Sequence, residues 1–375
     1  MAENKKQVNN KSTVIALSAV QDIYIPTKVE IKDVAKDYVS FGKNNKYPQE
    51  CYAYYQNCST LKSIIDTTSD FILGNGVEVP EDFINSKGED LEVIIKKIGI
   101  QFLIHNGYAI KVIRDAKLKL IDLLVMDFKQ CRVDKDMKNV YVSDKWGSYG
   151  SNKADVYPIY NPKKNESIYI YNGILNDDEV YPTPRYAAVF QSIETEMGVQ
   201  NFHLTTVKKG FTGNVIINFN NGEPTEDQMK ELKKKVDEFT GEFGRRYMLT
   251  FSNHKDNQTT VSKIPEDNFD QKYLEMSKSV MNNIFGAFSC QPILVGRTNE
   301  NIGFNTQEFV EAFKLYNRTV IMPYQKQILK SLTTIGIENI IIKPFSLEYD
   351  EEKSVTDNTD TDDSSDNAIG FKTNK

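Results

Sequence analysis

The chain has 375 residues, 39% of them hydrophobic and 26% charged, which is ordinary for a soluble protein and long enough for two or three domains or one elongated subunit. No apolar run is long enough to span a membrane and the first residues lack the apolar core of a signal peptide, so we expect the protein to lie in the cytoplasm of the cell that makes it. A net charge of −6 argues against tight non-specific binding of nucleic acid. The four cysteines are scattered and form no Cys-x-x-Cys pair, which argues against a disulfide framework and against a zinc site.

Two amphipathic helices are predicted in the first third of the chain. Apolar residues recur at helical spacing over residues 61–72, with Ser59 as the expected N-cap residue. This helix should end at Gly74, because glycine readily adopts the left-handed conformation found after helix C-termini. A second helix is predicted over residues 89–103. We expect Asn106-Gly107 to be the turn that leads from this helix into a strand.

Six segments between residues 108 and 171 have the composition of strands and are separated by Asp, Gly and Asn. Together with the preceding helices they predict a mixed α+β region with an antiparallel sheet over residues 26–185. Trp146 and Tyr149 lie in a polar stretch of this region, where we expect them to anchor a loop rather than bind a ligand. The strands are predicted at residues 108–114, 118–125, 131–134, 139–143, 154–160 and 167–171.

A compact unit, residues 210–262, is predicted between two long helices, the first of which covers residues 186–209. The unit contains a strand over 214–219, a helix that starts at a Thr225/Gln228 capping box, and a strand over 247–251. The polar face of its helix is rich in lysine. A solvated helix face explains this pattern, and a partner-binding surface is the alternative. The lysines concerned are Lys230, Lys233, Lys234 and Lys235.

The second long helix, residues 263–290, carries one apolar stripe along its length and a shorter stripe partly around it, so it should pack on more than one side. It should end near Ser289, because Pro292 disfavours helical dihedrals in the residue before it. A polar loop follows, and a further helix should begin at Asn305 or Thr306 with Pro323 inside it. Since proline removes a backbone donor, we expect this helix to be kinked.

Both ends of the chain differ in composition from the rest. Residues 1–25 are polar, and we expect them to form a mobile arm. After a last strand over 339–347, residues 349–375 are crowded with Asp, Glu, Ser, Thr and Asn, which predicts a disordered acidic tail. Asp360-x-Asp362 lacks the glycine and the bidentate glutamate of a calcium-binding loop, so a solvated tail explains it better.

Motifs of catalysis are missing from the sequence. It contains no Gly-x-x-x-x-Gly-Lys-Ser/Thr phosphate loop, no Gly-x-Ser-x-Gly elbow and no His-Glu-x-x-His zinc motif. His105, His203 and His254 are expected to be structural or solvated. We therefore predict a protein that is not an enzyme and that needs no cofactor or metal.

An ordered series of motifs resembles the portal proteins of tailed double-stranded DNA bacteriophages. These proteins have an Ala-Phe, proline, Leu-Leu-Gly sequence, then a short loop, a helix start and a kinked helix. One departure is Gln291, where many relatives have a second proline, and it leaves the bend at this point open. The matching segments are Ala287-Phe288, Pro292-x-Leu294-Val295-Gly296, Phe304-Asn305-x-Gln307-Glu308, and Pro323 followed by Ile328 and Leu332.

The resemblance implies an elongated subunit with a mixed wing (26–185), stem helices (186–209 and 263–290), a clip (210–262), a tunnel loop (291–306) and a kinked tunnel helix with a small crown (307–348). It also implies a ring, usually dodecameric, at one capsid vertex of the virion, through which DNA passes without tight binding. The implied partners are the terminase large subunit, a head–tail adaptor, the major capsid protein and the scaffold. The implied channel residues are Arg297, Thr298, Asn299, Glu300 and Asn301, and the implied docking residues are Lys230, Lys233, Lys234, Arg245 and Arg246.

Two other interpretations stay open at this point. A nucleic-acid-processing enzyme of the packaging apparatus would need a phosphate loop or a carboxylate cluster, and the sequence has neither. A smaller head–tail adaptor ring would not need a compact unit between two long helices.

Overall fold

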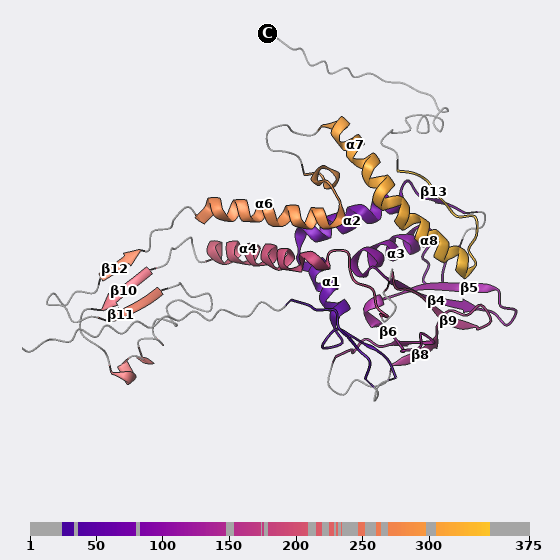
Figure 1. Cartoon of the computed structure of the whole chain (residues 1–375), viewed down its shortest axis with the longest axis horizontal. Helices are drawn as coiled ribbons and strands as arrows, with labels where there is room; N and C mark the ends of the chain where they lie inside the picture. The colour runs from indigo at the N-terminus through magenta and orange to yellow at the C-terminus, as the bar shows by residue number, and fades with distance from the viewer. Residues whose placement is uncertain are drawn as a thin grey trace, which may run out of the picture.

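A computed structural model describes residues 25–345 apart from thirteen short gaps; the expected arm and tail lie outside it. Figure 1 shows a body of helices and sheets from which α4 (Phe190–Lys208) and α6 (Phe269–Phe288) extend side by side, with a further small sheet beyond their far ends. Within the described residues, no helix is both long and apolar enough to cross a membrane. The gaps are residues 34–36, 80–82, 148–153, 174, 176–178, 209–214, 220–224, 229, 232–233, 235–246, 252–259, 264–268 and 298–304.

Three helices form the centre of the body: α1 (Tyr47–Asn57), α2 (Ser59–Leu73) and α3 (Leu91–His105). The predictions of α2 and α3 are confirmed, including their ends: Gly74 has a φ of +67° and Asn106 a φ of +56°. Helix α1 was not predicted, because its aromatic residues give only a weak amphipathic signal.

The start of α2 corrects one expectation. Ser59 is the first residue of the helix, and Cys58 occupies the N-cap position without capping the helix through its side chain. The N-terminal donors of α2 are therefore left for another part of the chain to satisfy.

Two antiparallel sheets, of three strands each, follow. In the first, β4 (Tyr108–Arg114) lies between β5 (Leu120–Met126) and β9 (Glu166–Tyr171). In the second, β7 (Asn139–Val142) lies between β6 (Cys131–Val133) and β8 (Asp155–Pro158). All six predicted strands are present, and the helix-to-strand turn at Asn106 is confirmed.

Trp146 anchors its loop, as expected: its indole N–H donates to the carbonyl of Gln130 at 2.7 Å, and its ring lies 4.7 Å from that of Tyr38. Tyr149 lies outside the described residues. Beneath this loop the guanidinium of Arg132 is fully buried, and it donates to the side-chain and backbone oxygens of Asn45 at 2.6 and 2.7 Å. Burial lowers the pKa of Arg132 to about 10, since a charged group loses its hydration there.

The extension consists of α4 (Phe190–Lys208), α6 (Phe269–Phe288) and a sheet of β10 (Val215–Phe219), β11 (Tyr247–Phe251) and β12 (Thr260–Lys263). Strand β10 is central, parallel to β11 and antiparallel to β12. A parallel pair requires a crossover connection. That requirement agrees with the predicted strand, helix, strand order. Strand β12 was not predicted.

The last long helix crosses the body as α7 (Thr306–Tyr316), a π-helical turn (Asn317–Ile321) and α8 (Met322–Ile335). Asn305 caps α7, accepting hydrogen bonds from the backbone N–H of Gln307 at 3.1 Å, as predicted. The irregularity expected at Pro323 takes the form of the π-helical turn just before it, which is one of the standard causes of a helix bend.

Short strands complete the body. β13 (Ile341–Ile342) pairs with β3 (Val77–Glu78), and is shorter than the strand predicted over residues 339–347. Near the N-terminus β1 (Glu30–Ile31) pairs with β2 (Ser40–Phe41).

Candidate functional site: the paired helices and their junction with the body

Helices α4 and α6 run antiparallel and lie side by side along their length (Figure 1). The rings of Phe202 and Tyr273 stack at 4.9 Å near the free ends. Nearer the body, the amide of Asn283 donates to the hydroxyl of Ser192 at 3.3 Å. At the junction, Tyr186 stacks on Phe288 at 5.7 Å. The pair therefore forms a straight two-helix unit joined to the body at one end.

Glu196 of α4 supplies the cap that α2 lacks. One carboxylate oxygen accepts from the hydroxyl of Ser59 at 2.9 Å and from the backbone N–H of Thr60 at 3.2 Å. The other oxygen accepts from the thiol of Cys58 at 3.5 Å. The side chain is almost fully buried. A carboxylate at this position satisfies orphan donors and faces the positive end of the helix dipole, so it locks α4 to the body.

Arg185 satisfies acceptors at the C-terminal end of α6. Its Nε donates to the carbonyl of Ala287 at 3.0 Å, and one terminal nitrogen donates to the hydroxyl of Ser289 at 2.9 Å. A cation at a helix C-terminus satisfies orphan carbonyls and is favoured by the dipole. Arg185 lies five residues before the first residue of α4, so the approach to one long helix holds the end of the other.

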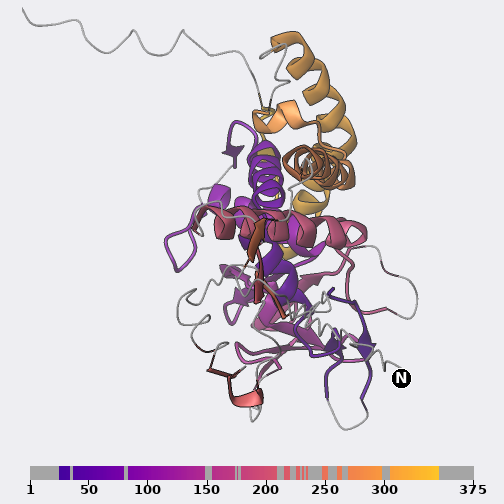
Figure 2. The same ribbon diagram turned by 90° about the vertical axis from the view of Figure 1, so that its left-hand side faces the viewer.

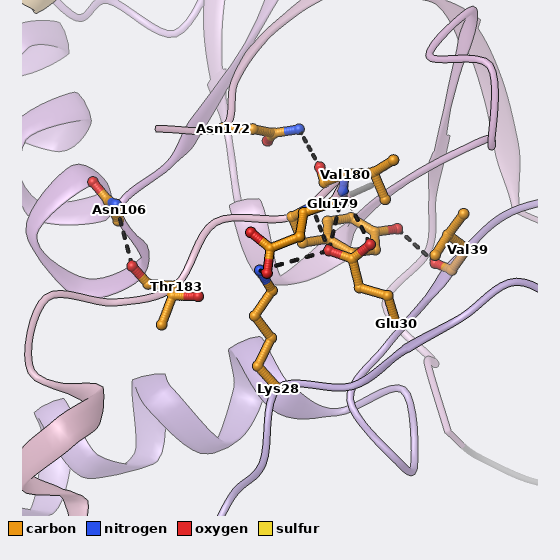
Figure 3. Close-up of polar contacts among 9 residues, drawn as sticks. Lys28, Glu30, Val39, Asn106, Asn172, Glu179, Val180 and Thr183 are labelled. Carbon is orange, nitrogen blue, oxygen red and sulfur yellow. Dashed lines mark hydrogen bonds and ion pairs between the residues drawn. The ribbon is translucent and has the colours of Figure 1, made fainter. Parts of the chain in front are cut away.

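The segment that leads into α4 is held from the N-terminal side by a carboxylate clamp, shown in Figure 3. Glu30 accepts from the backbone N–H of Val180 at 3.0 Å and of Tyr181 at 2.8 Å. Lys28 lies beside it and pairs with Glu179 at 2.9 Å. The hydroxyl of Tyr181 in turn donates to the carbonyl of Val39 at 2.6 Å.

Two asparagines fix the same segment from the opposite side (Figure 3). Asn172 donates to the carbonyl of Val180 at 2.6 Å, and Asn106, the left-handed residue after α3, donates to the carbonyl of Thr183 at 3.1 Å. Side chains from three parts of the body thus bind the backbone of the segment that leads into α4.

Of the predicted tunnel-loop residues, Arg297 is described and Thr298, Asn299, Glu300 and Asn301 are not. A helical turn, Pro292–Val295, and the left-handed Gly296 lead into the loop. Arg297 is exposed, yet its guanidinium lies 2.6 Å from the sulfur of Met281 and 3.5 Å from the hydroxyl of Thr60. The root of the loop therefore touches both α2 and α6.

Of the predicted docking residues, Lys230 and Lys234 are described, and both are exposed; Lys233, Arg245 and Arg246 lie outside the described residues. The helix that carries Lys230 and Lys234 starts with the predicted capping box. The N–H of Thr225 donates to the side-chain oxygen of Gln228 at 3.1 Å, and the N–H of Gln228 donates to the hydroxyl of Thr225 at 3.4 Å.

The chemistry available in this region is that of hydrogen bonding and packing. No group of three or more His, Cys, Asp or Glu that could hold a metal ion is found among the described residues. The four cysteines are free and buried. Burial raises the pKa of Cys58, Cys131 and Cys290 to about 12 each. A thiol held protonated in this way is a poor nucleophile.

Among the histidines, burial lowers the pKa of His105 to about 3, so this side chain is neutral at ordinary pH. Its ring stacks on Phe128 at 5.4 Å. His203 is exposed on α4, and His254 lies outside the described residues.

Sequence reasoning missed the contacts that fix the long helices to the body. No local pattern in the sequence assigns these roles to Glu196, Glu30 or Arg185. The one local signal was the absence of a capping side chain at Cys58, which leaves α2 in need of an acceptor from elsewhere.

Neither a comparison with models of protein families nor one with curated proteins finds a match. Among solved structures, a chain in the neck of a native GTA particle, computed with C12 symmetry, superposes with a TM-score of 0.52 at 10% identity, over 77% of this chain and 80% of that chain. A chain in the neck of an empty GTA particle, computed with C6 symmetry, gives 0.51 at 11% identity, over 79% and 84%. A portal protein of the HK97 phage family from Corynebacterium diphtheriae gives 0.47 at 10% identity, over 75% and 88%.

The chain has the fold of chains in the necks of GTA particles. The resemblance seen in the sequence and the α+β class are thereby confirmed. At 10–11% identity the likeness to the neck chains concerns the fold alone. We call α4 and α6 the stem helices and β10–β12 the clip sheet, after the corresponding predicted parts of a portal subunit.

Proposed function

We propose that this chain is a portal protein, and that its subunits form a ring at one vertex of a viral capsid through which double-stranded DNA is packaged and later ejected. The observation that supports this is the antiparallel pair of stem helices with a small sheet at its far end, in a chain that superposes on a chain of the GTA neck over 77% of its length. In the proposed ring the clip sheet projects from the capsid and docks the terminase motor, and later a head–tail adaptor.

The surface of the stem helices supports a ring. Leu204 of α4 is 52% exposed and Leu274 of α6 is 55% exposed, and both belong to a set of apolar side chains uncovered in the single subunit. Apolar patches of this kind mark contact surfaces. In a closed ring each subunit presents two different faces to its neighbours. The set comprises Phe202, Leu204, Val207, Leu274 and Met276.

A twelvefold ring is the proposed arrangement, since one of the similar neck structures was computed with C12 symmetry. Negative-stain microscopy of the purified protein tests the proposal. Rings with a central hole, and twelvefold class averages, are the expected result. Monomers or open filaments at every concentration would contradict it.

The tunnel loop and the clip give a functional test within the same proposal. Arg297 and Glu300 carry opposite charges on a polar loop, so each contact with a DNA phosphate would be weak enough to break as DNA slides, about 0–1 kcal/mol for an exposed pair. We expect Glu300→Ala to leave rings intact while it alters packaged DNA length.

Charge reversal at Lys233 and Lys234 should also leave rings intact and weaken motor docking. Loss of rings in either variant would assign these residues to subunit contacts instead.

A further inference from the structure

Four cations lie along the outer face of the last long helix. Lys314 and Arg318 are one turn apart before and within the π-helical turn, and Lys326 and Lys330 are one turn apart on α8; all four are exposed. Residues four apart share a helix face, and 16 residues of helix span about 24 Å. We call these four residues the basic stripe. Figures 1 and 2 both place α7 at the edge of the body.

The stripe carries little compensating charge. Glu308 and Glu311 precede it on α7, and from Ala312 to Ile337 the sequence contains no Asp or Glu. Among the described residues, none of the four cations makes an ion pair, whereas cations elsewhere in the body do, such as Lys343 with Glu78 at 2.9 Å. Two exposed apolar side chains, Leu315 and Met322, lie between the cations. The face is therefore suited to a polyanionic partner with some apolar content.

The described chain ends beside this stripe. The ring of Phe345 lies 5.3 Å from that of Phe313 on α7 and 5.0 Å from that of Phe71 on α2. Phe313 is buried on the inner side of α7, and Lys314, the first cation of the stripe, follows it on the exposed side. Residues after Phe345 thus start from a fixed point on the inner side of α7, close to the first cation of the stripe.

The remaining 30 residues carry the complementary charge. Residues 346–375 contain nine acidic and three basic residues, a formal charge of −6, which equals the net charge of the whole chain. The rest of the chain is accordingly neutral overall. The acidic segment also contains a few apolar residues, among them Val355 and Ile369, which could cover Leu315 and Met322.

We propose that the acidic C-terminal segment, residues 346–375, binds the basic stripe of its own subunit and covers it. The lengths are compatible: a coil-like chain of 30 residues has a root-mean-square span of about 30 Å, which is enough to reach the whole stripe of about 24 Å. Tethering so near to the site gives a local concentration on the order of millimolar, so even weak contacts would be occupied. The contact should be salt-sensitive, because both partners are exposed charges.

A distance measurement between two dyes tests this proposal on the full chain. Ser365→Cys places one dye in the segment and Thr319→Cys places the other between the cations of the stripe. The four native cysteines are buried, so they should not be labelled. We expect high energy transfer at about 0.05 M salt and a fall of about twofold or more at about 0.5 M, where screening shortens the range of the attraction.

Two charge variants make the result specific. Replacing all four stripe residues by Gln should lower energy transfer at low salt to the high-salt value. Replacing Lys117, Lys119, Lys163 and Lys164 by Gln removes the same charge from other exposed positions and should leave energy transfer unchanged. Thermal melting of each variant verifies that it is folded.

Two kinds of result would contradict binding of the segment to the stripe of its own subunit. Energy transfer that is unaffected by the stripe substitutions, or reduced as much by the control substitutions, would show that the segment does not bind the stripe. A signal that appears only when singly labelled donor and acceptor chains are mixed would assign the contact to a neighbouring subunit and overturn binding within one chain.

Discussion

The carboxylate of Glu196 on stem helix α4 accepts a hydrogen bond from the backbone N–H of Thr60 on α2 at 3.2 Å, across 136 residues of sequence. Two further donors, the Ser59 hydroxyl and the Cys58 thiol, reach the same carboxylate. The stem is thus joined to the body through the capping of a buried helix end, a contact whose loss leaves polar groups unsatisfied.

Replacing Glu196 by Ala should therefore lower the free energy of unfolding by about 1–3 kcal/mol, the cost of leaving a buried donor without its acceptor. Glu196→Gln keeps one acceptor oxygen and should lose less. Chemical denaturation followed by circular dichroism measures both. Glu275→Ala, on the exposed side of α6, is the control and should be neutral. Equal losses for the Ala and Gln variants would point to charge, not capping, as the dominant contribution.

Exposed apolar side chains on the stem should determine assembly. Burying one leucine stabilises a contact by about 1.5–3 kcal/mol. We expect Leu204→Asp combined with Leu274→Asp to shift rings to monomers in light scattering after size exclusion, while the melting temperature of the monomer changes little. Val156→Asp, at a similarly exposed position on β8, is the matched control. If that control dissociates rings as strongly, the wing and not the stem forms the decisive contact.

A pH dependence follows from His105. Its folded pKa of about 3 lies below the value of about 6.5 expected in the unfolded chain. The unfolded state therefore binds a proton first as the pH falls, so stability is fully present above pH 6.5 and decreases below it, by at most about 1.4 kcal/mol per pH unit. His105→Phe should flatten the curve between about pH 6.5 and 5, above the range where carboxylates titrate. His203→Gln, at an exposed site, should keep the wild-type slope, and identical slopes in all three proteins would contradict the assignment.

The sequence alone predicts those parts of the structure that depend on contacts between residues close along the chain. Both helix ends at Gly74 and Asn106, the capping residue Asn305 and the Thr225/Gln228 box were predicted, because each depends on contacts within a few residues. The six strands of the two body sheets were also predicted, since alternation and turn residues suffice to locate strands.

What the sequence did not reveal depends on distant partners. The acceptors of the α2 donors and of the Val180 N–H lie more than a hundred residues away, and no local pattern selects Glu196 or Glu30 for these roles. The net charge of −6 conceals an uneven distribution: the acidic excess lies after residue 345, whereas residues 312–337 contain basic residues and no Asp or Glu.

Glu30 provides the last prediction. Its carboxylate accepts from two consecutive backbone N–H groups at the approach to α4, and Lys28, at 12% exposure of its side chain, is shielded beside it (Figure 3). Glu30→Ala should release this N-terminal segment and so speed tryptic cleavage after Lys28 by about tenfold, the equivalent of about 1.4 kcal/mol in the opening equilibrium. Mass spectrometry of the early digest measures the rate. Glu78→Ala removes an exposed ion pair with Lys343 and should leave cleavage after Lys28 unchanged. If Glu30→Ala cleaves at the wild-type rate, the clamp does not hold the segment, and the position of the stem depends on the other junction contacts, those of the asparagines, Glu196 and Arg185.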